Sequence, residues 1–253
     1  MKNSISRSFI EVFEPAMKSK GFIRKGKVFH RIVNNKIVQC LGYYSYFMSR
    51  TFTITFTIRP LCFGREFGEN MCDKRLCEVY AGIINPWYYE GAEGYTEYMP
   101  IALKATEEML FPRFDTEIDY KSYDESYRKS KAFTKGWGII PFDIFILALI
   151  SEDYKEAQKI GDTQHEDWIK ANMQQFGTEY HKVSERQEMF ERRWKGYDRL
   201  KEAMNNGDRK TIDEYIASLE QKSLESYIKA YCTPKKYEKY LETRILPFEI
   251  VKV

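Results

Sequence analysis

Hydrophobic and polar residues alternate strictly along residues 51–58, within the stretch RTFTITFTIRP. Successive side chains of a strand point to opposite sides of a sheet, so this alternation predicts a strand over about residues 50–59. Pro60 ends it, because proline has no backbone N–H to donate to a neighbouring strand. We expect one face of the strand to lie on the core and the other to be solvated or partly covered. The core-facing residues are Phe52, Ile54, Phe56 and Ile58, and the other face is a row of threonines at 51, 53, 55 and 57.

A helix is predicted at the N-terminus. Apolar residues recur at helical spacing between Phe9 and Met17, which indicates a helix over about residues 4–20. Gly21 suits the position just after the helix, where the backbone adopts a left-handed conformation.

A hairpin follows this helix in the prediction. Strands are expected at about 28–33 and 36–46, joined at Asn34-Asn35. Asparagine tolerates the positive φ of a two-residue primed turn, and such a turn would place Ile32 opposite Ile37. The helix and the three strands together predict a three-stranded antiparallel meander covered by the helix.

The chain alternates less regularly after residue 60. YTEYMP (95–100) indicates a short strand ended by Pro100, and residues 101–111 indicate a helix with proline at its start. Residues 148–160 (ALISEDYKEAQKI) also resemble the sequence AMNNGDRKTIDEYI from 203 onward. Each has a small residue, a polar turn, an aspartate at a helix N-cap position and an amphipathic helix, which predicts helical hairpins and leaves repeat ancestry open. The helices expected in this region are 142–150, 152–160, 164–176, 180–204, 208–220, 222–231 and 234–243.

These elements predict an α+β fold. An N-terminal helix lies on an antiparallel β-sheet meander, and a mainly α-helical C-terminal region follows. The expected division is an α+β domain over residues 1–135 and a helical region over 136–253, and the prediction leaves open whether the two pack as one unit.

Charge is distributed unevenly along the chain. The net charge of the 253 residues is +3, but residues 1–60 hold eleven basic and two acidic side chains, a net charge of +9. The remaining residues therefore carry −6, and such asymmetry is typical of an anion-binding face or of two halves that solvate separately. Five cysteines, an odd number, favour reduced thiols over a disulfide framework, and no signal-peptide pattern is present, so we expect a cytoplasmic protein.

No motif in the sequence indicates a catalytic or metal site. Cys72 and Cys77 lack a second ligand pair at zinc spacing, and the sequence contains no nucleophile elbow or phosphate-binding glycine loop. We therefore predict no cofactor and no metal. The triplet Asp119-Tyr120-Lys121 has the acidic-x-Lys form of some nucleases, and the alternating carboxylates at 115, 117 and 119 would share one face if they lay on a strand.

Basic residues and tyrosines around the first strands are the candidate binding site. We expect a non-enzymatic protein that binds another protein with an acidic patch, because aromatic and arginine side chains commonly carry interface energy. A nucleic-acid-binding protein is the alternative, and a metal-dependent hydrolase is the third reading. The candidate residues are Arg24, Lys25, Lys27, Arg31, Tyr43, Tyr44 and Tyr46.

Residues 9–60 resemble a bacterial family defined only as a domain of unknown function, number four-three-zero-four. The resemblance rests on a leading helix, the segment GFIRKGKVFHR (21–31), a hairpin and the strand FTITFTI (52–58), and it covers about the first half of the chain. It implies a fold and supplies no catalytic residues. Related small α+β domains lie near toxin genes in bacterial genomes, so the resemblance points to an immunity-like or adaptor role.

Overall fold

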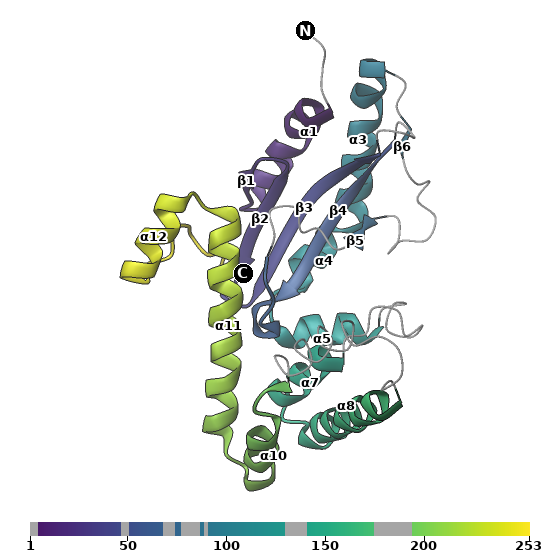
Figure 1. Cartoon of the computed structure of the whole chain (residues 1–253). Helices are drawn as coiled ribbons and strands as arrows, with labels where there is room; N and C mark the ends of the chain where they lie inside the picture. Colours follow the sequence, from purple (N-terminus) through teal and green to yellow (C-terminus); the bar gives the residue numbers. More distant parts are fainter. Residues whose placement is uncertain are drawn as a thin grey trace. The chain divides into compact units, whose positions relative to one another are not determined.

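The computed structural model describes residues 5–46, 51–67, 74–76, 87–88, 91–129, 141–174 and 194–253. Within these ranges the side chains of residues 46, 74–75, 87–88, 91–95 and 168–174 are not described. The chain packs into two compact units (Figure 1). Unit 1 comprises Met1–Lys131 and Glu220–Val253, and unit 2 comprises Ala132–Leu219. The C-terminal residues from Glu220 thus belong to the same unit as the sheet.

Unit 1 begins with helix α1 (Ile5–Ser19), as the spacing of its apolar residues predicted. Phe9, Phe13 and Met17 are fully buried along one side of the helix. Gly21 has a φ of 77° and ends the helix in the left-handed conformation, while the N–H of Phe22 reaches back to the carbonyl of Met17 at 3.0 Å. These two features are those of a Schellman motif.

An antiparallel sheet forms the centre of unit 1 (Figure 1). Its strands lie in the order β1-β2-β3-β4-β5, and β6 also pairs with β4. The α+β prediction with an antiparallel meander is therefore confirmed, although β1 was not expected. Gly26, with a φ of 59°, opens the two-residue turn between β1 and β2. The strands are β1 (Ile23–Lys25), β2 (Val28–Val33), β3 (Ile37–Tyr46), β4 (Thr51–Pro60), β5 (Lys74–Arg75) and β6 (Trp87–Tyr88).

The turn between β2 and β3 has the predicted backbone but a different register. Asn34 and Asn35 have φ values of 50° and 58°, as a primed turn requires. However, Val33 pairs with Ile37, so the predicted pairing of residue 32 with residue 37 is wrong by one position. The cause is Lys36, whose N–H donates to the Val33 carbonyl at 2.9 Å and which stays in the loop.

Both faces of the sheet are covered. On one face, the ring of Phe9 in α1 lies 5.6 Å from that of Phe29 and 4.8 Å from that of Tyr43. The opposite face packs on helix α11 (Arg209–Tyr231), where Ile32 and Cys40 share a buried cluster with residues of the helix such as Tyr227. The threonines of β4 lie on this second face and are 0–7% exposed, so the expectation of a solvated or partly covered face is wrong.

Three further helices of unit 1 precede the second unit in sequence. They are α3 (Gly91–Met109), α4 (Phe111–Thr116) and α5 (Tyr120–Lys129). The strand predicted at 95–100 is wrong, because Pro100 lies inside α3. Met99, Ala102 and Thr106 are fully buried at helical spacing, and this buried stripe outweighs the local strand pattern.

The C-terminal part of unit 1 continues from α11 into α12 (Pro234–Thr243) and an extended tail. Val251 of the tail forms a parallel bridge with Val33 of β2, and the N–H of Asn34 donates to the Val251 carbonyl at 3.0 Å. Gly21 leaves room for this tail, since a Cβ there would lie 2.9 Å from Val251 Cγ2.

Unit 2 is helical in its described residues. It contains α7 (Pro141–Ile150), α8 (Tyr154–Gln174), α10 (Tyr197–Asn206) and the first half of α11. Helix α8 is continuous from Tyr154 to Gln174, where two separate helices had been predicted at 152–160 and 164–176, and α11 likewise replaces the two helices predicted at 208–220 and 222–231. Among the described helices of both units, none has the length and apolar character needed to cross a membrane.

Candidate functional site

Arg31 of β2 is a core residue and not part of an exposed basic face. It is 5% exposed, and its Nε donates to Gln39 Oε1 at 2.8 Å across the β2–β3 pair. Its terminal nitrogens donate to the carbonyls of Lys20 at the end of α1 and of Phe114 in α4. Burial lowers the pKa of Arg31 to about 10, and Asp115, 3.9 Å away, opposes that shift. The side chain therefore joins α1 and α4 to the sheet.

Lys25 of β1 is also used by the fold. Its Nζ donates to the carbonyls of Ala230 at 2.5 Å and Cys232 at 3.3 Å, at the C-terminal end of α11. The last carbonyls of a helix carry partial negative charge and lack partners within the helix, so an ammonium group there stabilises the helix end. Lys25 thus fixes the end of α11 against the edge of the sheet.

Arg24 and Lys27 remain at the surface. The side chain of Arg24 is 36% exposed, and its Nε lies 3.6 Å from Glu14 of α1. Lys27 is exposed in the β1–β2 turn, with its Nζ 5.5 Å from the centre of the Tyr43 ring. Of the four predicted cations, these two keep their charges accessible to a partner.

The three predicted tyrosines have different positions. Tyr43 is 8% exposed and packs on α1, so its ring is not available for stacking with a base. Tyr44 is 54% exposed on the other face of β3. The side chain of Tyr46 lies outside the described residues. The structure therefore brings Lys27 beside Tyr43, leaves Tyr44 on the opposite face of β3, and does not gather the described candidate residues on one surface.

A buried polar cluster under α11 was missed in the sequence. His30 Nδ1 lies 2.5 Å from the hydroxyl of Tyr227, and the His30 ring stacks on Tyr231 at 4.4 Å. Burial, with a smaller contribution from Lys25, lowers the pKa of His30 to about 3, so the imidazole is neutral near pH 7. Burial raises the pKa of Tyr227 well above its usual value. The cluster serves packing between sheet and helix, and no short-range signal marks it because His30 and Tyr227 are 197 residues apart.

The acidic residues considered for a hydrolase have structural partners. Asp119 caps α5, accepting from the Ser122 N–H at 2.8 Å, and Tyr120 donates from its buried hydroxyl to Glu220 at 2.5 Å. Glu117 is buried and accepts from Arg113 at 2.5 Å, while residues 115–117 lie at the end of α4 and not on a strand. The described residues hold no group of three or more His, Cys, Asp or Glu side chains that could bind a metal ion. Cys72 and Cys77 lie outside them.

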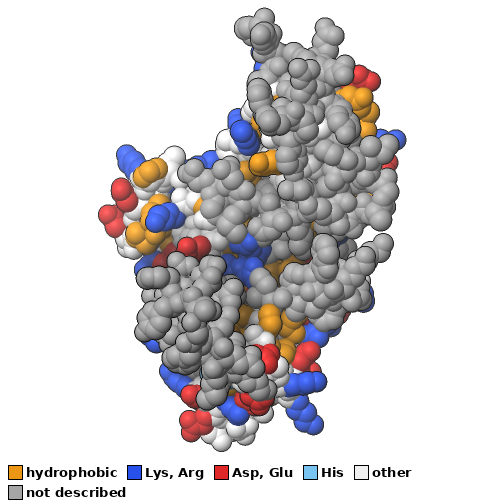
Figure 2. Space-filling view, turned by 45° about the vertical axis from the view of Figure 1, so that its right-hand side comes forward, with side chains coloured by type: hydrophobic (Ala, Val, Ile, Leu, Met, Phe, Trp, Pro, Cys, Tyr) orange, Lys and Arg blue, Asp and Glu red, His pale blue; other side chains and the backbone are white. Residues whose placement is uncertain are grey.

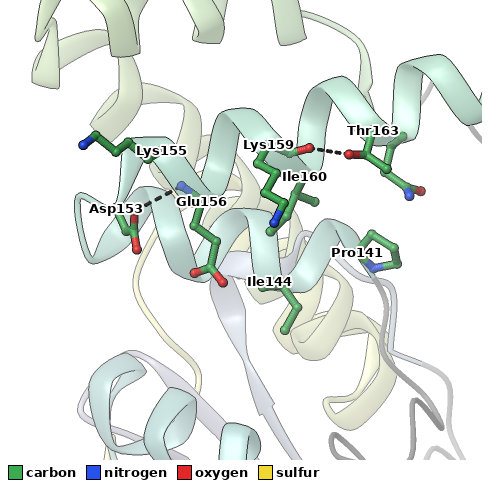
Figure 3. Close-up of a pocket in the computed structure, with 9 residues that line it drawn as sticks. Pro141, Ile144, Asp153, Lys155, Glu156, Lys159, Ile160 and Thr163 are labelled. Carbon is green, nitrogen blue, oxygen red and sulfur yellow. Dashed lines mark hydrogen bonds between the residues drawn. The ribbon is translucent and has the colours of Figure 1, made fainter.

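A groove in unit 2 lies between α7 and α8 and has a volume of about 650 Å³. Ile144 of α7 and Ile160 of α8 contribute apolar surface, with Pro141 at one end (Figure 3). Lys159 and Glu156 extend from α8 toward α7 in the same view. The remaining lining residues are Asp153, Lys155, Thr163 and Gln164.

Lys and Arg side chains lie among Asp and Glu side chains on the described part of the surface shown in Figure 2. Comparisons of the chain with protein-family models, with curated proteins and with solved structures find no match. The resemblance of residues 9–60 to the domain of unknown function therefore stays a prediction, and any functional argument rests on the geometry of this chain alone.

Proposed function

We propose that this protein binds another protein without catalysing a reaction on it, using the exposed end of the β1–β2 hairpin. We call this region the hairpin surface, formed by Ile23, Arg24, Lys27 and Tyr44. The observation that carries the proposal is the exposure of two large side chains, Ile23 of β1 at 45% and Tyr44 of β3 at 54%, together with two accessible cations, Arg24, which follows Ile23 in the chain, and Lys27. Exposed apolar and aromatic groups beside positive charge are common features of protein interfaces.

The remaining charge on the hairpin surface favours an acidic partner. Arg24 shares the carboxylate of Glu14 with Lys18 and stays partly open to solvent. Lys27 lies in the β1–β2 turn and is exposed. Such rim charges act mainly on the association rate, because they steer a charged partner before contact is made.

The small number of accessible cations and tyrosine rings favours a protein partner over a nucleic acid. A nucleic-acid surface neutralises several phosphates, and each contact adds about −0.9 to the salt dependence of duplex binding. Here Arg31 is in the core and Lys25 caps α11, which leaves Arg24 and Lys27 from the predicted strip. Tyr43 is buried as well, so of the predicted tyrosines whose side chains are described only Tyr44 could stack on a base.

The test is a charge reversal confined to the hairpin surface. A tagged wild-type chain first captures its partner from lysate of the native cell, and association is then measured with the purified partner at low and high salt. We expect Arg24→Glu with Lys27→Glu to slow association about tenfold at low salt and less at high salt. Adding Tyr44→Ala should speed dissociation, because it removes an exposed ring from the interface.

Matched controls keep this test clear. Lys104→Glu with Lys121→Glu reverses two exposed charges elsewhere in unit 1 and should leave association unchanged. Circular dichroism checks that each variant is folded. An unchanged association rate for the hairpin variant contradicts the proposal. Tight, salt-dependent binding of labelled DNA or RNA that the same variant abolishes would support the nucleic-acid alternative.

A further inference from the structure

The tail that follows α12, residues 245–253, binds the edge of β2 as a short parallel strand. The N–H of Val251 donates to the Ile32 carbonyl at 3.1 Å, and the Val251 carbonyl accepts from the Asn34 N–H at 3.0 Å. These are the two bonds of the parallel bridge between Val251 and Val33. The end of the chain accordingly lies beside β2 in Figure 1. A segment far away in the sequence thus completes this edge of the sheet.

The side chain of Asn34 also binds the tail. Its Oδ1 accepts from the Val253 N–H at 3.2 Å, and its Nδ2 donates to the main-chain oxygen of Val253 at 3.4 Å. Val251 lies directly on Gly21, where a Cβ would be 2.9 Å from Val251 Cγ2. We call the site formed by Gly21, Val33 and Asn34 the tail slot.

Two apolar side chains bind the tail nearer to α12. Leu246 and Phe248 are partly buried against the cluster under α11, and the Phe248 ring lies 5.4 Å from that of Tyr227. A segment that fills both places needs an aromatic residue and, three positions later, a small branched residue that fits on Gly21. The sequence that the structure shows in the slot is that of this chain.

The hinge between α12 and the bound part of the tail is short and strained. Two residues, Arg244 and Ile245, separate the end of α12 from Leu246. Arg244 has a left-handed backbone with a φ of 56°, which is unfavourable for a residue with a Cβ. Short hinges under strain favour exchange of the following segment between copies of a protein, because exchange lets the hinge relax.

Apolar side chains are exposed on both sides of this hinge. Leu241 is 41% exposed and Ile245 is 67% exposed, and of the ten residues of α12 only Tyr240 is buried. Single exposed apolar residues are common, but neighbouring ones often mark an interaction surface. Two copies that were joined at their hinges would bring these side chains together.

We propose that two copies of this chain exchange their tails, so that each tail slot binds residues 246–253 of the other copy. The contacts within the slot are the same after exchange, because the other copy has the same sequence. Arg244 leaves its left-handed conformation, and Leu241 and Ile245 of the two copies cover each other. The covalent attachment of each tail to its own chain favours the closed monomer at low concentration, so exchange increases with protein concentration.

The first test traps a tail in the slot of another copy. A Cβ at residue 21 would lie 4.0 Å from the Val251 Cβ, within the range of about 3.5–4.5 Å that a disulfide requires. Full-length Gly21→Cys and Val251→Cys chains, one of them tagged, are equilibrated together in mild urea and then oxidised. We expect a covalent heterodimer on a non-reducing gel, because this bond forms only when the tail of one chain occupies the slot of the other.

Two controls accompany this test. Lys252→Cys takes the place of Val251→Cys in the first, since Lys252 is exposed and successive side chains of an extended segment point to opposite sides. Its mixture with Gly21→Cys should form no more covalent dimer than wild type does. In the second, one chain carries both Gly21→Cys and Val251→Cys. At low concentration it should form the disulfide within itself, which shows that the two positions meet in the closed monomer.

The second test changes the hinge. Arg244→Gly and Arg244→Ala both remove the 2.6 Å pair between Arg244 and Glu225, but only glycine removes the cost of the left-handed backbone from the closed form. We expect the glycine variant to dimerise about tenfold more weakly than the alanine variant. Sedimentation equilibrium over a range of concentrations measures both dimerisation constants.

Three outcomes overturn the proposal. One is the absence of the covalent heterodimer although the doubly substituted chain closes on itself, which would keep the tail in its own slot. Another is failure of the doubly substituted chain to close. The third is equal dimerisation of the two Arg244 variants. Arg24→Glu with Lys27→Glu should leave tail exchange intact, so failure here and failure of the hairpin surface to bind a partner are distinguishable.

Discussion

The α7–α8 and α10–α11 hairpins have the same turn but present different helix surfaces. In α7, the eight residues from Phe142 to Leu149 are all buried, including Asp143. In α10, only Tyr197, Leu200, Ala203 and Met204 are buried. In both turns the N–H of an aspartate, Asp153 or Asp208, donates to the carbonyl of the residue five positions earlier. The turn thus depends on chemistry within a few residues, whereas burial of a helix depends on what packs against it.

The contact between the hairpins is the point at which a substitution should have the largest effect. Gly161→Ala would place a Cβ 2.1 Å from the Tyr197 ring, far inside contact distance. Alanine is favoured over glycine in a helix by about 1 kcal/mol, but overpacking costs about 1–3 kcal/mol. We expect a net loss of up to about 2 kcal/mol in the free energy of unfolding, measured by urea denaturation followed by circular dichroism.

A double-mutant cycle sharpens this prediction. Tyr197→Ala removes the ring that the new methyl group would meet, at the cost of its own packing. The double variant should therefore lose less stability than the two single losses added together. If the losses of the two single variants simply add, α8 and α10 do not contact each other at Gly161 and Tyr197, which would contradict the packing of one hairpin on the other.

The second prediction concerns the left-handed residue of each turn. Gly207 occupies this position in one hairpin and Glu152 in the other. A left-handed backbone costs a residue with a side chain about 1–2 kcal/mol, so Gly207→Ala should destabilise the protein by about 1 kcal/mol. Glu152→Gly should be more stable than Glu152→Ala by a similar amount, because both lose the 3.3 Å pair with Arg209 and only glycine relieves the backbone. Equal stability of the two Glu152 variants would contradict a shared turn.

These turns could be predicted from the sequence because the groups that form each turn are close together in the chain. The aspartate, the left-handed residue and the helix N–H groups lie within nine residues of one another. The same holds for Gly21 after α1 and for the positive φ of Asn34 and Asn35. Local propensity decides such features, so a single sequence shows them.

The wrong predictions concern features that are determined by contacts between residues far apart in the sequence. Arginine is usually a surface residue, yet Arg31 is held in the core by a hydrogen bond to the carbonyl of Phe114, 83 residues away. The threonine row of β4 has the pattern of a solvated face, but that face packs on α11, as the Cys40–Tyr231 contact shows across 191 residues. The β2–β3 register depended on Lys36, whose carbonyl accepts from Leu61. Of the candidate binding residues, Arg24, Lys27 and Tyr44 are exposed, whereas Lys25 and Arg31 hold elements of the fold together.

The smallest expected effect is the difference in stability loss between alanine variants of the two capping aspartates, Asp153 and Asp208. Asp153→Ala removes one bond, to the N–H of Glu156, and should cost about 1 kcal/mol in unfolding experiments near pH 7. Asp208→Ala removes two bonds, to the N–H and the hydroxyl of Thr211, so we expect the larger loss in the same assay. Equal losses would mean that the hydroxyl contact adds nothing.

Acid titration then tests the second cap. The Thr211 bonds hold the pKa of Asp208 below its usual value. A carboxylate with a lowered folded-state pKa stabilises the protein above its unfolded-state pKa, about 3.9, and loses that contribution as the pH falls through the folded-state value. The stability difference between wild type and Asp208→Asn, which keeps a capping oxygen without a charge, should therefore shrink below about pH 4. A difference that is constant down to pH 2 would show that the charge of Asp208 does not contribute to the stability of this turn.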